Sequence, residues 1–312
     1  MSALETSPTS TITVSPLSPT IGAEIGGIDL RQPLSDAQFS ELHQALLDYK
    51  VIFFRDQPLN HDQHLAFGRR FGKLEVHPFG AQHSTHPEVL EISHDDRNYG
   101  YENLWHSDVT WRLAPSLGSI LLMKHAPAVG GDTLFADMYA AYDGLPNELK
   151  AEIDGLVARH DFAGFRRGLE RKGASAAEIE EFNSTYPNPE HPVVRTHPET
   201  GRRGIYVNTA FTEEILGVTP ERSAELLALL YHQATYPEYQ CRFRWQANSI
   251  AFWDNRACQH YAASDYYPNV RAVERVTVIG DVPYFDADQP VTGRVEPRPF
   301  RGVIDRTAGR SL

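Results

Sequence analysis

The sequence predicts an α+β protein whose core is a double-stranded β-helix, or jelly roll, with flanking helices. Two features of the sequence lead to this fold class. Short stretches rich in β-branched and aromatic residues, spaced as in antiparallel sheets, recur along most of the chain. Helical patterns are grouped near the N-terminus and in the middle, and they do not alternate regularly with the strands. We therefore expect a sheet core with helices on its outside.

The N-terminal elements are predicted to be a helix, a buried strand and a second helix. Ser35 is a good N-cap, and Phe39 and Leu42 follow it at helical spacing, so a helix is predicted as far as about residue 49. The continuous apolar run at 51–54 predicts a strand that is buried on both faces. The second helix is predicted over 60–72.

The remaining elements are shorter, and the turn and strand patterns define them. Further strands are predicted at 11–14, 23–25, 89–93, around His106, and at 118–123, 133–136, 193–198, 204–208, 239–245, 249–253 and 273–279. Further helices are predicted at 138–142, at 146–157 and from Thr219 onward.

A single domain is expected over residues 11–282. It is preceded by a disordered tail at 1–10 and followed by an extended tail at 283–312. Residues 165–189 are charged and weakly patterned, and we interpret them as an insertion or mobile region that could be helical at 174–182.

The composition limits the classes of protein to consider. Hydrophobic residues make up 41% of the chain, which is enough for a packed core and excludes global disorder. The net charge of −12 is unlike that of a typical nucleic-acid binder, so no nucleic-acid partner is expected. Two cysteines are too few for a disulfide framework or a thiolate zinc cluster. The chain shows no signal-peptide pattern and no apolar stretch of about 20 residues, so we expect a cytoplasmic protein without membrane contact.

A histidine and an aspartate stand two residues apart, at His106 and Asp108. On an extended strand both side chains would point to one face, and a further imidazole would complete a two-histidine, one-carboxylate triad. Such a triad holds Fe(II) and leaves positions open for oxygen and an organic co-substrate. We interpret His106, Asp108 and His260 as this triad. The alternative is a hydrogen-bonded His–Asp pair on a sheet. The similar run at His61–His64 is interpreted as a surface helix start.

Two arginines follow the second histidine at Arg271 and Arg275. If residues 266–270 form a turn, the strand that begins at Arg271 can run beside the one that ends at His260. The two arginines are four residues apart and would share one face of that strand. One of them could clamp the distal carboxylate of a dicarboxylate co-substrate. A pair of surface arginines on an edge strand is the alternative.

Together these motifs resemble the TauD/TfdA family of Fe(II)/2-oxoglutarate dioxygenases. The resemblance extends from about residue 21 to residue 282. The stretches that carry it are His106-Ser107-Asp108, Gly130-Gly131-Asp132-Thr133, Trp253-Asp254-Asn255-Arg256 with His260, Arg271, Gly22-Ala23-Glu24-Ile25, 51–55 and 191–198.

The resemblance implies a cofactor and two co-substrates. His106, Asp108 and His260 match the ligands of Fe(II), Arg271 matches the partner of the distal carboxylate of 2-oxoglutarate, and Thr133 matches a hydroxyl that helps to hold that carboxylate. In this family 2-oxoglutarate chelates the iron, and its oxidative decarboxylation with O2 gives succinate and carbon dioxide while a substrate C–H bond is hydroxylated. In members that act on sulfonates or sulfate esters, the hydroxylated carbon bears the heteroatom. The product then breaks down to an aldehyde and sulfite or sulfate.

The anion-binding residues of the sulfonate-hydroxylating members have counterparts in this chain. A histidine and an arginine of those members match His77 and Arg275, and Phe211 matches an aromatic wall of the pocket. A cationic arginine and a histidine donor suit a tetrahedral oxyanion. Structural roles are the alternatives, because His77 precedes Pro78 and could cap a loop, and Phe211 could belong to the core.

The other end of the predicted pocket departs from those members. Gly80 stands where they carry a tyrosine, and Phe165-Arg166 replaces a Ser-Phe pair. An asparagine on the amine side falls at Glu102 or Asn103. The anion end therefore matches while the opposite end is remodelled, which favours an anionic substrate other than taurine.

The sequence thus predicts an enzyme that hydroxylates a small organic anion. The first choice is an aliphatic sulfonate such as taurine, or an alkyl sulfate ester. The alternative within the class is a carboxylate, either a phenoxyalkanoate or an amino-acid-like metabolite. From another class, a non-catalytic jelly-roll binding protein is the alternative, although it would not need an intact triad. A homo-oligomer, dimeric or tetrameric, is also expected.

Overall fold

The computed structural model describes residues 11–78, 83, 85–100, 102–171 and 173–295. The tail predicted at 1–10, residues 296–312 of the C-terminal tail, and Gly80 therefore lie outside the described residues. Within the described residues, no helix is both long enough and apolar enough to cross a membrane.

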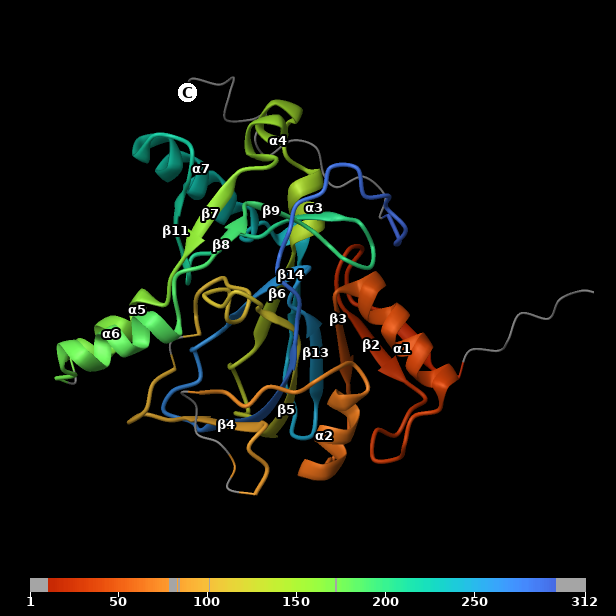
Figure 1. The fold of residues 1–312 in the computed structure, drawn as a ribbon. Coiled ribbons are helices and arrows are strands. Elements are labelled where there is room, and N and C mark those ends of the chain that lie inside the picture. Colours follow the sequence, from red (N-terminus) through yellow and green to blue (C-terminus); the bar gives the residue numbers. More distant parts are fainter. Residues whose placement is uncertain (1–10, 79–82, 84, 101, 172, 296–312) are drawn as a thin grey trace, which may run out of the picture.

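Two sheets form the core of the molecule (Figure 1). The larger sheet has the strand order β1-β2-β3-β13-β5-β15-β4 and the smaller the order β12-β6-β14. Nearly all neighbouring strands are antiparallel; the β2–β3 pair is parallel. The strands are β1 (Thr13–Pro16), β2 (Ala23–Gly26), β3 (Val51–Phe54), β4 (Val89–His94), β5 (Ser116–His125), β6 (Thr133–Asp137), β12 (Gln240–Phe243), β13 (Ile250–Asp254), β14 (Cys258–Ala262) and β15 (Arg271–Ile279).

The two sheets pack face to face through one hydrophobic cluster. It contains Val51 and Phe53 of β3, which lie in the larger sheet, together with Phe135 and Phe243 of the smaller sheet. The rings of Phe53 and Phe243 stack with their centroids 4.0 Å apart. Inward side chains of two facing sheets are the expected core of a jelly roll, so the predicted fold class is confirmed.

Helices cover the outer face of the larger sheet. Ile52 and Phe54 alternate with the inward residues of β3 and pack outward against α1 (Asp36–Tyr49) and α2 (His61–Arg69). Strand β3 is therefore buried on both faces, as predicted. The first helix begins at the predicted cap, where the Ser35 side chain accepts a hydrogen bond from the backbone of Gln38.

A second cluster of helices lies at one end of the core. Here α3 (Met138–Asp143), α4 (Asn147–Ile153) and α7 (Pro220–Gln233) pack with short strands around a separate apolar core, seen at the top of Figure 1. The short strands are β7 (Val157–His160), β8 (Glu190–Pro192), β9 (Val194–Thr196), β10 (Arg203–Ile205) and β11 (Thr212–Ile215). The predicted helix at 146–157 is thus too long: it stops at Asp154, and Val157 starts a strand.

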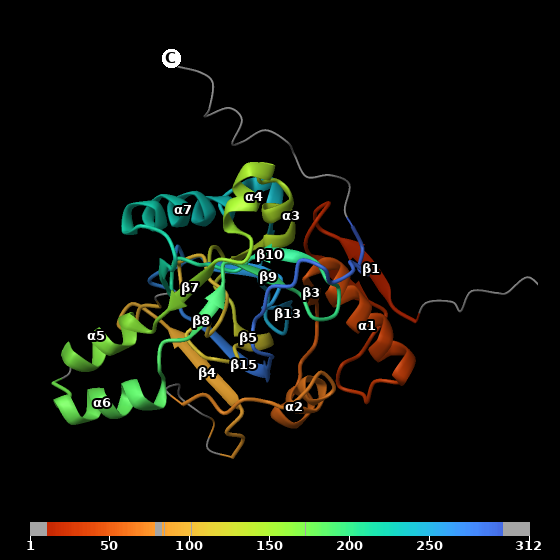
Figure 2. The same ribbon diagram turned by 45° about the horizontal axis from the view of Figure 1, so that its top comes forward.

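The segment 165–189 was interpreted as an insertion or mobile region that could be helical at 174–182, and the structure contains more helix than that. It contributes to a helical hairpin that projects from the core, formed by α5 (Ala163–Arg171) and α6 (Ala176–Thr185) (Figure 2). Helix α6 was anticipated as an option, and its Ser175 side chain caps the helix. Helix α5 buries none of its described side chains completely, and its large apolar residues, Phe165 and Leu169, stand four residues apart on one side of the helix.

The described part of the C-terminal segment, 283–295, contains no helix or strand and lies along the β9–β10 hairpin. The backbone N–H of Thr196 donates to the carbonyl of Tyr284, and the backbone N–H of Thr292 donates to the carbonyl of Thr200. The segment therefore covers this hairpin.

Candidate metal centre and active-site cavity

Three side chains that were predicted to form a triad converge in the space between the two sheets. His106 Nε2 lies 3.8 Å and His260 Nε2 lies 3.9 Å from Asp108 Oδ1. One potential ligand atom from each residue lies within 4.8 Å of the other two, and all three residues are buried. The predicted grouping of these residues is therefore present in the fold.

The backbone brings them together differently from the prediction. His106 does not lie on a strand; it forms an isolated bridge with His260, with each backbone N–H donating to the other carbonyl at 3.1 and 2.8 Å. Asp108 lies in a turn, and Val109 after it has a left-handed φ of 51°. The turn, and not the two-residue period of a strand, aims Asp108 at the histidines.

Asn255 holds this turn in place. Its Oδ1 accepts a hydrogen bond from the backbone N–H of Asp108 at 2.6 Å, and its Nδ2 donates to the carbonyl of Asp108 at 2.9 Å. Asn255 follows β13, the central strand of the larger sheet, and is completely buried. The amide of this one side chain therefore replaces the strand partner that Asp108 lacks.

The predicted position of the arginine strand also needs correction. Strand β15 does not run beside the strand of His260, because β14 pairs with β6 in the smaller sheet while β15 pairs with β4 and β5 in the larger. Arg271 and Arg275 therefore face His260 across the space between the sheets. Both arginines line the same cavity as the triad.

The protonation of the triad suits a divalent cation. His106 Nδ1 lies 2.7 Å from the carbonyl oxygen of Leu104, which can only accept, so Nδ1 carries the proton and Nε2 keeps its lone pair. Burial and the neighbouring His106 lower the pKa of His260 to about 3, so its imidazole is neutral. Burial alone would raise the pKa of Asp108, but Arg275 and the two imidazoles outweigh burial and hold it well below its usual range.

Two neutral imidazoles and one ionised carboxylate are the donor set of a facial triad. Ser119 donates to the second oxygen of Asp108 at 2.9 Å, which leaves Oδ1 on the side of the histidines. Buried charges of this kind need a partner, and a divalent cation between the three donors would provide one. The residues that are present therefore fit the metal that the motif implies.

A cavity of about 420 Å³ opens beside the triad. Thr133 and Arg271 lie together in its wall: Trp245 donates its indole N–H to the Thr133 hydroxyl at 2.9 Å, and the Arg271 guanidinium lies 5.8 Å from the same indole ring. Arg271 Nε donates to the carbonyl of Gly131, and burial lowers the pKa of its guanidinium. This part of the wall thus offers a desolvated cation and a hydroxyl.

Three further predicted residues line the cavity: His77, Phe211 and Arg275. Arg275 Nη1 donates to Asp108 Oδ1 at 3.2 Å, while its buried Nε has no hydrogen-bond partner among the described residues. Burial and the charge of Arg275 lower the pKa of His77 to about 4. The Phe211 ring lies edge-on to His106, with centroids 6.3 Å apart.

Three other predicted residues are not in the wall of this cavity. Phe165 stacks behind Phe162, with ring centroids 5.0 Å apart, so that Phe162 lines the cavity in its place. Arg166 pairs with Asp161 at the start of the helical hairpin. Asn103 lines a small adjoining pocket.

Glu102 lines the main cavity and the adjoining pocket, so of the two neighbours it is the one that reaches the triad's cavity. Its carboxylate lies 3.4 Å from His94. Burial alone would raise the pKa of Glu102, but His94 outweighs burial and lowers it to about 2. The pair places an anionic group near Arg271.

Several residues of the site were not singled out from the sequence. Asn255 belongs to a motif that carries the family resemblance, but no role was predicted for it. Apart from that motif, no pattern in the sequence indicates that it is buried beside the turn of Asp108. Ser119 lies among apolar residues of β5, where a buried hydroxyl needs a polar partner, which here is Asp108. Phe162 was not singled out either; its ring stacks on that of Trp111 with ring planes 4° apart, and both rings line the cavity. Only the tertiary fold brings these two rings together.

Comparison with known proteins places the chain in a family. Residues 13–277 match the profile of "Taurine catabolism dioxygenase TauD, TfdA family". The chain belongs to the TauD/TfdA family. It is 38% identical over 279 residues to an alpha-ketoglutarate-dependent sulfate ester dioxygenase of Pseudomonas putida, covering 86% of this chain and 90% of that protein.

Two further relatives are similar over most of their length. An alpha-ketoglutarate-dependent 2,4-dichlorophenoxyacetate dioxygenase of Cupriavidus pinatubonensis is 31% identical, with 86% of this chain and 98% of that protein covered. The crystal structure of a taurine dioxygenase from Burkholderia xenovorans matches with a TM-score of 0.77 and 39% identity, covering 93% of this chain and 96% of that one.

Family membership decides between the classes that the sequence left open. This TauD/TfdA protein is an oxidoreductase, an alpha-ketoglutarate-dependent dioxygenase, so a non-catalytic binding protein is excluded. The family implies a metal together with 2-oxoglutarate and O2 as co-substrates. The His106–Asp108–His260 group offers two histidines and one carboxylate for that metal, in the same cavity as Arg271 and Thr133.

Proposed function

We propose that this protein is an Fe(II)/2-oxoglutarate dioxygenase that hydroxylates the heteroatom-bearing carbon of an alkyl sulfate ester or an aliphatic sulfonate. For a sulfate ester the overall reaction converts the ester, 2-oxoglutarate and O2 into an aldehyde, sulfate, succinate and carbon dioxide. The observation that carries the proposal is the pair of inward guanidinium groups on β15, at Arg271 and Arg275. Two anions, co-substrate and substrate, each need one such group.

The metal is assigned to the triad. His106, Asp108 and His260 would hold Fe(II) on one side and leave the other positions facing the cavity. Bound iron with 2-oxoglutarate and O2 supplies the oxidising power for C–H hydroxylation. The protein supplies a fixed donor set: the carbonyl of Leu104 sets the tautomer of His106, and Ser119 orients Asp108.

Arg271 and Thr133 are assigned to the distal carboxylate of 2-oxoglutarate. The guanidinium is buried, and within the described residues its hydrogen bond to the Gly131 carbonyl uses Nε, which leaves its terminal amino groups for a bidentate contact. The hydroxyl of Thr133 already accepts from Trp245 and can donate its own proton to an anion. A dicarboxylate therefore finds a cation and a donor at this part of the wall.

Arg275 and His77 are assigned to the anionic group of the primary substrate. The buried Nε of Arg275 has no hydrogen-bond partner among the described residues, and an oxyanion would satisfy it. With its pKa lowered to about 4, His77 is neutral near pH 7 and can donate one hydrogen bond without adding a charge. Because Arg275 also contacts Asp108, the anion is held next to the metal.

The rest of the wall selects an apolar substituent. Trp111, Phe162 and Phe211 line the cavity together with Leu90 and Val109. Such a wall suits an alkyl chain, and the Glu102 carboxylate, which also lines the cavity, already pairs with His94. A sulfate ester with an alkyl chain therefore fits better than taurine, in agreement with the relative that acts on sulfate esters.

A second candidate substrate is a phenoxyalkanoate, in which Arg275 would bind a carboxylate. The aromatic rings of Trp111 and Phe162 favour it, because they can pack against an aryl group. A relative that acts on 2,4-dichlorophenoxyacetate is 31% identical to this chain.

A substrate panel separates the candidates. The protein loaded with Fe(II) is supplied with 2-oxoglutarate and O2, and succinate is measured with alkyl sulfates, alkanesulfonates, taurine and phenoxyalkanoates; released sulfate, sulfite or phenol is measured alongside. We expect the highest kcat/KM with an alkyl sulfate, with sulfate and succinate formed in equal amounts. A higher kcat/KM with a phenoxyalkanoate would select the second candidate, and no stimulation by any of these anions would overturn both.

A further inference from the structure

Three histidines cluster on the face of the larger sheet that is turned away from the triad. His61 is the first residue of α2, and His83 and His86 lie on the connection between α2 and β4. One ring nitrogen of each lies within 4.8 Å of the other two. All three side chains are half-buried, so a cation in solution can reach them.

The spacing of these rings fits a tetrahedral metal site. His83 Nδ1 lies 3.3 Å from His86 Nδ1, and the ring centroids of His61 and His83 are 4.2 Å apart. Two nitrogen ligands bound at about 2.0–2.1 Å in a tetrahedral site are separated by roughly 3.3 Å. The backbone N–H of Thr85 donates to His83 Nδ1 at 3.3 Å, and the Thr85 hydroxyl lies 3.1 and 2.9 Å from the Nδ1 atoms of His83 and His86, so a bound cation would take the place of these hydrogen bonds.

Two carboxylates lie next to His61. His61 Nε2 lies 3.0 Å from Glu274 Oε1, and His61, Glu91 and Glu274 form a second group of potential ligands within 4.8 Å of one another. Glu91 and Glu274 are direct cross-strand partners of β4 and β15, an arrangement of like charges that is unfavourable without a cation. Glu274 is buried, and its Oε2 has no hydrogen-bond partner among the described residues.

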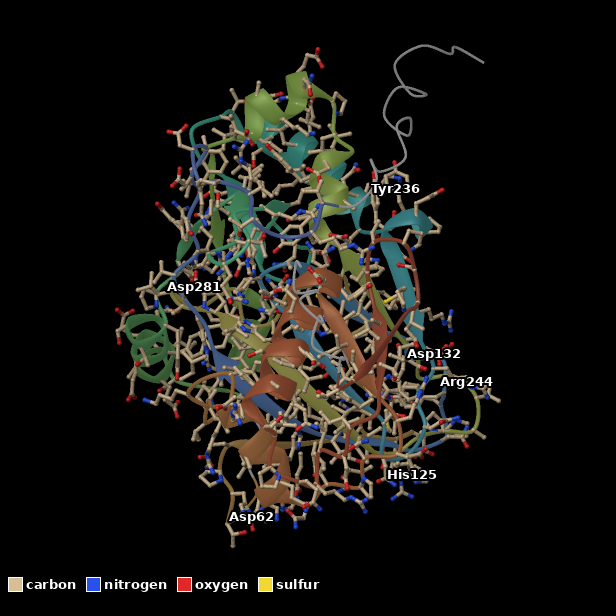
Figure 3. All side chains as sticks on the ribbon, turned by 90° about the vertical axis from the view of Figure 1, so that its right-hand side faces the viewer. Asp62, His125, Asp132, Tyr236, Arg244 and Asp281 are labelled. Carbon is tan, nitrogen blue, oxygen red and sulfur yellow. The ribbon has the colours of Figure 1, made fainter. Side chains whose placement is uncertain are left out.

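The other charged neighbours leave room for a cation. Lys124 lies 3.3 Å from Glu274 Oε1 and neutralises part of the charge of the two glutamates. Asp62 lies 3.2 Å from His86 Nε2. A carboxylate that accepts a hydrogen bond from the second ring nitrogen commonly orients a histidine ligand of a metal, and Asp62 can do so here. Figure 3 shows Asp62 at the surface of the molecule, at the end of α2.

We propose that His61, His83 and His86 bind a borderline divalent cation such as Zn2+, with Glu274 as the hydrogen-bond partner that orients His61. Imidazole ligands favour Zn2+ over the oxygen-seeking Mg2+ and Ca2+. The site is distinct from the triad because Glu274 points to the opposite face of β15 from Arg275. A bound ion would join the start of α2, the connection before β4 and the edge of the sheet. The proposal does not depend on the substrate of the enzyme.

Zinc stoichiometry tests this site. Chelator-treated protein is dialysed against Zn2+, and bound metal is measured in the wild type, in His83→Ala/His86→Ala and in His106→Ala/His260→Ala. We expect about two equivalents in the wild type and about one in each double variant. In the His106→Ala/His260→Ala background, further removal of His61 should weaken Zn2+ binding by roughly 100-fold. Co2+ in place of Zn2+ should give the visible absorption of a tetrahedral site only where the three histidines are intact.

A matched control is His232→Ala. His232 is exposed on α7, and its ring lies 4.8 Å from that of Tyr236, which Figure 3 places at the opposite end of the molecule from Asp62. This variant should keep both equivalents. One equivalent in the wild type, or the same loss in His232→Ala as in His83→Ala/His86→Ala, would overturn the proposal. Because the His83 and His86 side chains are only half-buried, their removal should leave the thermal unfolding of the metal-free protein unchanged, which separates lost ligands from lost fold.

Discussion

The guanidinium of Arg275 donates to Asp108 Oδ1 at 3.2 Å, the same oxygen that lies nearest to both triad histidines. The proposed substrate anchor and the proposed metal ligand are therefore in direct contact. When Arg275 also binds an anion, its charge is shared between the anion and the carboxylate ligand. Binding of the substrate is thus expected to change the donor strength of Asp108 at the metal.

Replacing Arg275 should separate substrate binding from co-substrate binding. Arg275→Ala removes the proposed anion partner, so KM for the primary substrate should rise on the order of 10- to 100-fold while KM for 2-oxoglutarate changes little. Arg271→Ala is the matched control and should show the reverse pattern. Steady-state succinate formation, with each substrate varied in turn, measures both. If Arg275→Ala lost 2-oxoglutarate affinity and Arg271→Ala did not, the two roles would be exchanged.

Loss of one triad histidine should abolish iron binding at this centre. His106→Ala leaves only His260 and Asp108 as donors, and we expect no Fe(II) at the triad and no succinate formation. Treatment of the wild type with a chelator should likewise remove activity, and Fe(II) should restore it. Anaerobic Fe(II) titration in the presence of 2-oxoglutarate, followed by the visible charge-transfer absorption, is the measurement. Wild-type absorption in His106→Ala would remove this residue from the ligand set.

Replacing Asn255 should lower the free energy of unfolding and also weaken metal binding. Asn255→Ala leaves the buried N–H and carbonyl of Asp108 without their partner, at a cost of about 1–3 kcal/mol for each group. We expect a lower free energy of unfolding in urea and weaker Fe(II) binding. Asn98→Ala is a suitable control, because its side chain donates to the Ser93 carbonyl at an exposed position. If both variants lowered the free energy of unfolding equally, the hydrogen bonds between Asn255 and Asp108 would stabilise the fold no more than an exposed hydrogen bond does.

Glu199 gives a pH dependence of stability that is separate from the triad. The hydrogen bond from His43, together with Arg256, lowers the pKa of Glu199 from 4.5 to about 2. Because its pKa is lower in the folded state, Glu199 stabilises the fold fully above about pH 4.5, and this contribution is lost as the pH falls toward 2. Unfolding in urea between pH 2 and 5 should therefore show a smaller acid-induced loss of stability in Glu199→Gln than in the wild type. Parallel pH curves for the two proteins would contradict the prediction.

The sequence predicted the layers of this fold well where the pattern of side chains is dictated by burial. The apolar run of β3 identified a strand covered on both faces, and Ser35 identified the start of α1. The helix α5 was not predicted, because its few apolar side chains contact the projecting α6 and not a core. Its large apolar side chains are only Phe165 and Leu169, one helical turn apart, and so short a pattern does not distinguish a helix from an irregular charged segment.

The structure brings the three residues of the predicted triad together, but with a backbone conformation different from the predicted one. The spacing of His106 and Asp108 was interpreted as a strand, whereas the structure has a bridge followed by a turn. The clamp from Asn255 could not be predicted, because it joins positions 147 residues apart. Likewise, the position of Phe162 rather than Phe165 in the cavity wall could not be predicted from the sequence, because it depends on how the α5–α6 hairpin packs against the core.

Strand β15 presents Arg271 and Arg275 to one side of the sheet and Glu274 to the other. Successive side chains of a strand point to opposite faces of the sheet. A substitution on one face of β15 therefore leaves the direction of the side chains on the other face unchanged. Insertion or deletion of one residue within β15 would exchange the two sides at once. The length of β15 is thus constrained by both faces of the sheet at once, in addition to the identities of Arg271, Arg275 and Glu274.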